Sequence, residues 1–325
     1  MSFVMNLKIE FHMHKQAEQG SDEKGDDSEE MLSAYLEKEL QRLAACRAES
    51  TMTNYRTAVR ALMGYLEHDV PLKAVDAVII GGFERRLREQ GICLNTISCY
   101  MRSLRSLLGE PLRGAFGSVY TGNARTEKRS LSLDCISQLR NLTLQEGSFD
   151  ALARDVFLFS FYAMGMPFVD VANLRHHQLS ADALVYHRQK TGQRIVVPLE
   201  PPLLDIIARY DGLGTDHRIF PLLEHGNMRE YQLVLARYNR ALRRLALKAG
   251  IGKKLTSYVA RHSWASAAYG QNVDLSVISH ALGHTNPNTT LVYIREIDDQ
   301  RVKEANELII NSIGNATDNT PNEET

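Results

Sequence analysis

The sequence has no apolar run long enough to cross a membrane, and we expect no secretory leader. Its start, MSFVMNLKIEFHMHK, lacks the apolar segment and cleavage site that a signal peptide needs. The four cysteines show neither C-x-x-C spacing nor a disulfide framework; they are Cys46, Cys93, Cys99 and Cys135. We therefore expect a cytoplasmic protein with reduced thiols, no metal site and no membrane partner.

The chain also lacks an overall positive charge, because 38 Lys and Arg oppose 39 Asp and Glu for a net charge of −1. The net charge is an average over two acidic ends and a basic middle part of the chain. Residues 1–30 hold three Lys and eight acidic residues, and residues 313–325 hold three acidic residues and no basic one. The rest of the chain has 35 basic and 28 acidic residues, a net charge of about +7. This excess permits DNA binding, although proteins that never meet DNA often show it too.

The 325 residues, of which 44% are hydrophobic, are enough for two domains. Residues 1–30 are expected to be a mobile acidic segment, because so polar a stretch cannot bury enough surface to become ordered. Residues 31–109 contain four stretches with apolar residues at helical spacing, which predicts a small helical bundle. Residues 110–130 combine proline, glycine and basic residues without an apolar period, as an interdomain linker does.

Residues 131–312 predict a second domain of α+β type. Apolar and polar residues alternate in ALVYHRQKTGQRIVVPL and turn at Thr191 and Gly192, which predicts a β-hairpin among helices. Residues 313–325 are expected to form a disordered tail. The expected fold class is therefore mainly α with a small antiparallel β-sheet.

The most informative stretch runs from Leu255 to Ile297 and contains Arg261, His284 and Tyr293. Two helix-like runs joined by a turn separate Arg261 from His284, so the ends of these runs can come together. A guanidinium matches two phosphate oxygens, an imidazole can donate another hydrogen bond, and a tyrosine hydroxyl is a nucleophile. No carboxylate cluster for Mg²⁺ accompanies them, so cationic side chains must stabilise the developing charge.

This stretch resembles the C-terminal motif of the tyrosine recombinases, the phage-integrase family. The family pattern is His-x-x-Arg-His, then Leu-Gly-His, then a nucleophilic Tyr nine residues later. The matching residues here are Tyr258 to His262, Leu282 to His284, and Tyr293. Each residue alone would more simply be a surface charge, a helix cap or a core aromatic. Agreement in order and distance over about forty residues makes the set specific.

The resemblance implies a site-specific recombinase of the kind found on mobile elements, which performs integration, excision or inversion. Tyr293 would attack a phosphodiester and form a 3′-phosphotyrosine, while Arg261 and His284 bind nonbridging oxygens. Lys190 would protonate the departing 5′ oxygen. The phosphotyrosine conserves the bond energy, so no ATP or other cofactor is needed. The implied partners are double-stranded DNA with specific sites, three further subunits in a tetramer on that DNA, and accessory DNA-bending proteins.

Two catalytic positions depart from the family pattern. The first catalytic arginine of the family falls on Pro167, which has no donor for phosphate. We expect Arg188 to replace it, because strand residues two apart point to the same side and Lys190 follows two residues later. Tyr258 replaces the family's histidine, and a phenol with a pKa of roughly 10 can orient groups but is a poor general base. Tyr258 also competes as nucleophile, although the spacing favours Tyr293.

In the bundle and linker the resemblance implies a clamp on DNA. The basic contact candidates are Arg56, Arg60, Arg102, Arg105, Arg125 and Lys128. Each of them alone is more simply a solvated surface charge. Two other functions stay open at this point: a catalytically weak DNA-binding relative that regulates recombination, and a type IB topoisomerase, which shares the chemistry.

Overall fold

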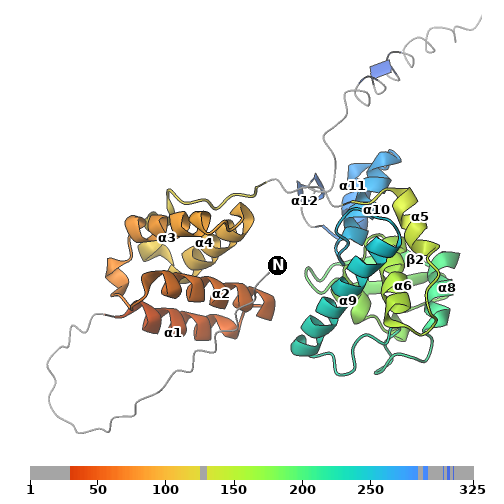
Figure 1. Ribbon diagram of the computed structural model, residues 1–325, viewed down its shortest axis with the longest axis horizontal. Helices are drawn as coiled ribbons and strands as arrows, with labels where there is room; N and C mark the ends of the chain where they lie inside the picture. The colour runs from red at the N-terminus through yellow and green to blue at the C-terminus, as the bar shows by residue number, and fades with distance from the viewer. Residues whose placement is uncertain are drawn as a thin grey trace, which may run out of the picture. The chain divides into compact units, whose positions relative to one another are not determined.

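The computed structural model describes residues 30–124, 130–284 and 288–291, together with residues 303, 306, 307 and 310. The described chain is mainly helical and contains one two-stranded antiparallel sheet, which confirms the expected fold class (Figure 1). No helix in this part of the chain is long and apolar enough to span a bilayer. The chain divides near residue 126 into two compact units. Except for Glu30, the predicted acidic segment and the predicted tail at 313–325 lie outside the described residues.

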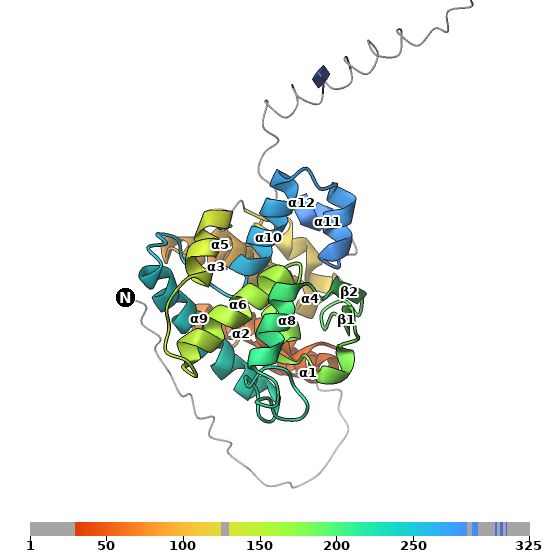
Figure 2. The same cartoon turned by 90° about the vertical axis from the view of Figure 1, so that its right-hand side faces the viewer.

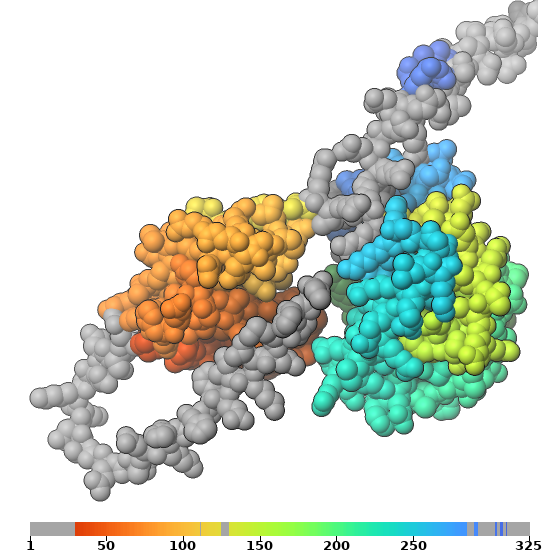
Figure 3. Space-filling view, in the orientation of Figure 1, coloured from red at the N-terminus to blue at the C-terminus, as the bar shows by residue number. Residues whose placement is uncertain are grey.

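Four α-helices build the described part of the N-terminal unit, as the apolar periodicity predicts. They are α1 (Leu32–Ala44), α2 (Glu49–Leu66), α3 (Ala77–Glu89) and α4 (Leu94–Leu108), with the 3-10 helix η1 (Leu72–Ala74) before α3. Their apolar faces meet in one core, in which Leu62, Phe83 and Met101 are almost fully buried. Asp76 caps α3 by accepting hydrogen bonds from two backbone amides of its first turn. On the face seen in Figure 3 these helices form one packed body.

The bundle continues beyond α4 into the stretch expected to be linker. Residues Glu110–Phe116 form the 3-10 helix η2, which packs against α3 and α4. Phe116 and Val119 are buried in the core of the bundle. The linker expected at 110–130 therefore begins later than the sequence indicated. A short 3-10 helix buries only a few side chains and leaves no apolar period by which to recognise it.

The second unit is organised around one buried helix. Its elements are α5 (Leu133–Arg140), α6 (Phe149–Tyr162), α7 (Phe168–Ala172), η3 (His176–Gln178), β1 (Ala183–His187), β2 (Arg194–Pro198), α8 (Pro201–Arg209), α9 (Met228–Lys248), α10 (Val259–Gly270), α11 (Leu275–Ala281) and α12 (Asn288–Leu291). Helix α6 contacts α5, α8, α9 and α10, so it is apolar nearly all round (Figures 1 and 2). Phe157 and Phe159 at its centre are 1% and 0% exposed.

The two strands form the predicted hairpin, with Ala183 opposite Pro198 and His187 opposite Arg194. Every second residue of each strand is buried against the core, and the residues between them are more exposed. Residues 188–193 make the turn, in which the amide of Gly192 donates to the carbonyl of Arg188 at 2.8 Å. This turn carries two of the predicted catalytic side chains.

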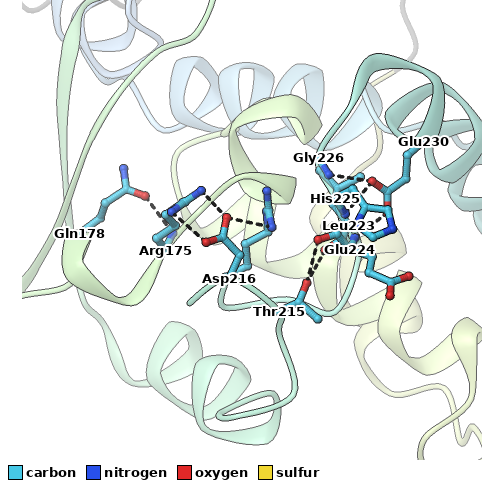
Figure 4. Close-up of polar contacts among 10 residues, drawn as sticks. Arg175, Gln178, Thr215, Asp216, Leu223, Glu224, His225, Gly226 and Glu230 are labelled. Carbon is cyan, nitrogen blue, oxygen red and sulfur yellow. Dashed lines mark hydrogen bonds and ion pairs between the residues drawn. The ribbon is translucent and has the colours of Figure 1, made fainter.

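Polar side chains hold the long connection between α8 and α9. Asp216 accepts a hydrogen bond of 2.5 Å from Arg175 Nη2 and lies 3.4 Å from Nη1 of the buried Arg218. Farther along, the carboxylate of Glu230 accepts from three consecutive backbone amides, those of residues 224–226 (Figure 4). Irregular backbone needs such partners, because it lacks the hydrogen bonds of a helix or sheet.

Candidate active site

Arg261 lies at the centre of a polar cluster in the second unit, which it forms with Arg188 and His284. It belongs to the first turn of α10, and its side chain is almost fully buried. Its Nη1 donates to the carbonyl of Gly165 at 3.1 Å, and its Nη2 donates to the carbonyl of Leu282 and lies 3.0 Å from His284 Nε2. A Cβ on Gly165, whose φ is +72°, would lie 2.8 Å from Arg261 Cα. The turn before α7 therefore needs glycine in order to approach α10 so closely.

Arg188 joins the same cluster from the hairpin turn. Its side chain is 8% exposed, and Nη1 donates to the carbonyls of Leu282 at 2.9 Å and Gly283 at 2.7 Å. The Nε atoms of Arg188 and Arg261 have no hydrogen-bond partner among the described residues. Burial, together with the charge of Arg261, lowers the pKa of Arg188. Two cations held this close create a site that favours an anion.

The route by which Arg188 reaches the cluster differs from the expected one. Strand β1 ends at His187, so Arg188 already belongs to the turn and alternation along a strand does not place it. Arg188 is buried, whereas Lys190 at the tip of the turn is exposed. Both side chains nevertheless act electrostatically on His284, so the turn brings both charges to the same place.

His284 follows α11 and connects two sides of the cluster. Its Nε2 faces Arg261 Nη2, and its Nδ1 lies 2.7 Å from Thr290 Oγ1 on α12. Burial, followed by the charges of Arg261, Arg188 and Lys190, lowers the pKa of His284 to about 4. The imidazole is therefore neutral at pH 7 while no anion is bound.

Two further residues lie near the cluster, and only the first was predicted from the sequence. Pro167 stands immediately before α7 and offers no donor at the family's first arginine position. Asp170, on α7, is buried, and its Oδ1 accepts the amide of Gln189 at 3.0 Å. Burial raises the pKa of Asp170. The hydrogen bond from the Gln189 amide to Asp170 holds the hairpin turn against α7. Its only signal in the sequence is that Asp170 stands three positions after Pro167, the place of the family's first arginine.

Of the two tyrosines considered as nucleophile, only Tyr258 lies within the described residues. Tyr258 immediately precedes α10, is 49% exposed and makes an edge-to-face contact with His262 at 4.9 Å between ring centroids. Its charged form would act on Arg188, which places it at the margin of the cluster. Tyr293, the predicted nucleophile, lies outside the described residues.

The predicted DNA contacts of the first unit lie on two helices. Arg56 and Arg60 on α2 and Arg102 and Arg105 on α4 are all exposed. Arg56 makes an ion pair of 2.6 Å with Glu49, and Arg102 Nε donates to a backbone carbonyl of its own helix at 3.3 Å. The last two candidates, Arg125 and Lys128, lie outside the described residues. Within the described ranges, no group of three His, Cys, Asp or Glu residues is placed to hold a metal ion.

Known proteins share both units. Residues 136–300 match the family described as Phage integrase family, and residues 31–113 match the Phage integrase SAM-like domain. Tyrosine recombinase XerA of Pyrococcus furiosus is 25% identical over 260 residues, which cover 78% of this chain and 87% of that protein.

Two solved structures show the same fold. A lambda integrase dimer bound to a COC′ core site matches with a TM-score of 0.65 and 16% identity, over 83% of this chain and 98% of that chain. A lambda integrase tetramer bound to a Holliday junction matches with a TM-score of 0.64 and 16% identity, over 84% of this chain and 80% of that chain. The match to the family covers about half of the chain, including the buried arginine cluster. The chain therefore belongs to the phage integrase family.

Proposed function

We propose that this protein is a site-specific DNA recombinase that cuts and rejoins DNA through a 3′-phosphotyrosine. One observation carries the proposal: Arg188, Arg261 and His284, from three separate segments, converge at the end of α11. A phosphodiester fits such a cluster, because its nonbridging oxygens accept hydrogen bonds and gain charge in the transition state.

In this mechanism the Tyr293 oxygen bonds to phosphorus and the bond from phosphorus to the 5′ oxygen breaks. Lys190 gives its proton to the departing 5′ oxygen. A 5′ hydroxyl of the partner strand then attacks the phosphotyrosine, which regenerates Tyr293 and a phosphodiester. Arg261 and Arg188 hold the nonbridging oxygens during both steps. Losing one such donor costs on the order of 10² to 10³ in rate.

Arg188 takes the place of the arginine that Pro167 replaces. Its burial and its position beside Arg261 support this assignment, because the two guanidinium groups donate to the same carbonyl. Tyr258, at the margin of the cluster, orients groups near the phosphate rather than accepting a proton. The nucleophile's proton then leaves to phosphate or to water.

The partner is double-stranded DNA with specific recombination sites. The lambda integrase structures contain a dimer on a core site and a tetramer on a Holliday junction, and their fold matches this chain. We propose the same assembly here, acting in the cytoplasm on the nucleoid, with accessory DNA-bending proteins as further partners. The exposed arginines of α2 and α4, with Arg125 and Lys128, would contact DNA phosphates.

Two alternatives fit less well. A regulator without activity would not need Lys190, Arg261 and His284 together, and this chain retains all three. A type IB topoisomerase would relax supercoiled plasmid as a monomer without a preferred site. The match of both units to phage-integrase domains favours recombination.

A suicide-substrate assay tests the proposal. Nicked duplexes from DNA flanking the gene are incubated with the protein, and covalent adducts are separated on a denaturing gel and mapped by peptide mass. The expected adduct is on Tyr293 and is absent in Tyr293→Phe. Binding without an adduct would support the regulator, and an adduct on Tyr258 would overturn the assigned nucleophile.

A further inference from the structure

One hydrogen bond joins the histidine of the cluster to the helix that precedes Tyr293 in the sequence. Thr290, on α12 (Asn288–Leu291), is fully buried, and its Oγ1 lies 2.7 Å from His284 Nδ1. Tyr293 follows Thr290 three positions later in the chain. The position of α12 and the position of the imidazole are therefore linked.

The other ring nitrogen fixes the direction of this bond. A guanidinium can only donate, so His284 Nε2 must accept from Arg261 Nη2 at 3.0 Å. In a neutral imidazole the proton then sits on Nδ1, which donates it to Thr290 Oγ1. Arg261 thus fixes the tautomer, while Thr290 accepts the Nδ1 proton and holds the ring in its orientation, as partners of the second ring nitrogen do for metal-bound histidines.

Binding of phosphate changes the state of the imidazole without breaking this bond. Among the described residues, the charged groups that act on His284 are cationic: Arg261 on α10, and Arg188 and Lys190 on the hairpin turn. A bound phosphate offsets their charge, so the pKa of His284 rises toward its usual value. Nε2 then gains a proton and can donate to the phosphate, while Nδ1–H stays on Thr290. A cationic donor makes that bond stronger.

We propose that Thr290 is a positioning residue that holds the His284 ring in its catalytic orientation only while α12 is docked against the cluster. The inference rests on the proposed recombinase function. It links two events: the segment leading to the nucleophile docks, and the histidine that assists the same phosphate becomes oriented.

Three full-length variants test the proposal. Thr290→Val removes the hydroxyl and keeps the shape, whereas Thr290→Ser keeps the hydroxyl. Thr289→Val changes the exposed neighbour on the same helix and serves as the matched control. The rate of adduct formation on the nicked duplex is measured from pH 5 to pH 9, and DNA binding is measured by gel shift.

We expect Thr290→Val to form the adduct about tenfold more slowly, since a hydrogen bond contributes roughly 0.5–1.5 kcal/mol and more when charged. Thr290 stabilises the protonated imidazole, so its loss lowers the pKa of His284 in the DNA complex. The decline of the rate with rising pH should therefore begin at lower pH in Thr290→Val. Thr290→Ser should restore the wild-type profile, Thr289→Val should keep it, and DNA binding should not change.

Equal slowing in Thr290→Val and Thr290→Ser, or slowing without any change in pH profile, would overturn the proposal. A second measurement separates this failure from failure of the proposed function. Nitrogen chemical shifts of ¹⁵N-labelled histidine, assigned with His284→Gln, report the tautomer without requiring activity. The wild type should show the Nδ1–H form of His284, and Thr290→Val should keep this form, which Arg261 fixes, but with the Nδ1 resonance shifted because its hydrogen bond is lost. If that difference is seen but the wild type forms no adduct, Thr290 keeps its role and the recombinase assignment fails.

Discussion

Arg188 and Arg261 donate hydrogen bonds to the same backbone carbonyl, that of Leu282 at the end of α11. The two arginines lie in different segments, one in a hairpin turn and one on α10. The carbonyls at the end of a helix carry partial negative charge, which allows two cations to approach each other here. A pair of guanidinium groups held in this way is preorganised for an anion.

Replacing Arg188 should abolish most of the activity if it takes the place of the missing arginine. We expect Arg188→Ala to slow adduct formation by about 10² to 10³-fold. Arg188→Lys should recover only part of the rate, because an ammonium lacks the planar fork that binds two oxygens. Arg194→Ala, at an exposed position of the same hairpin, is the control and should cleave normally. If Arg188→Ala cleaves normally while Lys190→Ala does not, Arg188 has no catalytic role.

A side chain at residue 283 should disrupt the cluster although every charged residue of the cluster is kept. Gly283 has a φ of +65°, and an added Cβ would lie 2.5 Å from Arg188 Cδ. We expect Gly283→Ala to destabilise the protein by about 1–3 kcal/mol and to reduce cleavage. Gly270→Ala is the matched control, because nothing lies within 4 Å of its added Cβ. Thermal unfolding should show a lower Tm for Gly283→Ala alone, and equal Tm values would refute the clash.

The stability of the free protein should depend on His284 between about pH 6.5 and 4. The pKa of His284 is lowered from 6.5 to about 4 on folding, so in this range the unfolded chain binds more protons. Stability from the neutral imidazole is complete above the unfolded pKa and decreases as the pH falls. Denaturant unfolding across this range should show a smaller pH dependence for His284→Gln than for the wild type. Identical slopes would mean that the folded pKa is not lowered.

The exposed arginines of the first unit should contribute to DNA binding by neutralising phosphates. Removing Arg60 and Arg105 together should weaken binding to all sequences alike and reduce the salt slope by about one for each phosphate that is no longer neutralised. Arg42→Ala, on α1, removes an exposed arginine paired with Glu39 and is the control. Gel shifts at several salt concentrations measure both quantities. An unchanged slope in the double variant would exclude these residues from the interface.

Local patterns of the sequence were sufficient for much of the fold. The four helices of the bundle follow from apolar residues at helical spacing, and the hairpin follows from alternation around Thr191 and Gly192. Residues Glu110–Phe116 were missed, because a 3-10 helix that buries few side chains has the same composition as a linker. Apolar periodicity identifies long helices and strands, but it does not identify a short 3-10 helix.

The cluster of Arg188, Arg261 and His284 was likewise only partly predictable from the sequence. Spacing alone indicated that Arg261 and His284 come together, and the structure places them 3.0 Å apart. Arg188 was proposed from strand alternation, but it reaches Arg261 from the turn after the strand ends. Neither the bond from the Gln189 amide to Asp170 nor the bond between Thr290 and His284 was predicted. Side-chain partners between separate segments leave no periodic trace in a sequence.

The sequence by itself determined the helical architecture, the hairpin and the set of residues suited to phosphate chemistry, because these depend on spacing along one chain. Only the tertiary structure decided that two arginines share one carbonyl, that Asp170 holds the turn, and that Thr290 faces the imidazole. These contacts join residues from different elements. Their distances depend on how α7, α10, α11, α12 and the hairpin pack together, and no local pattern encodes that packing.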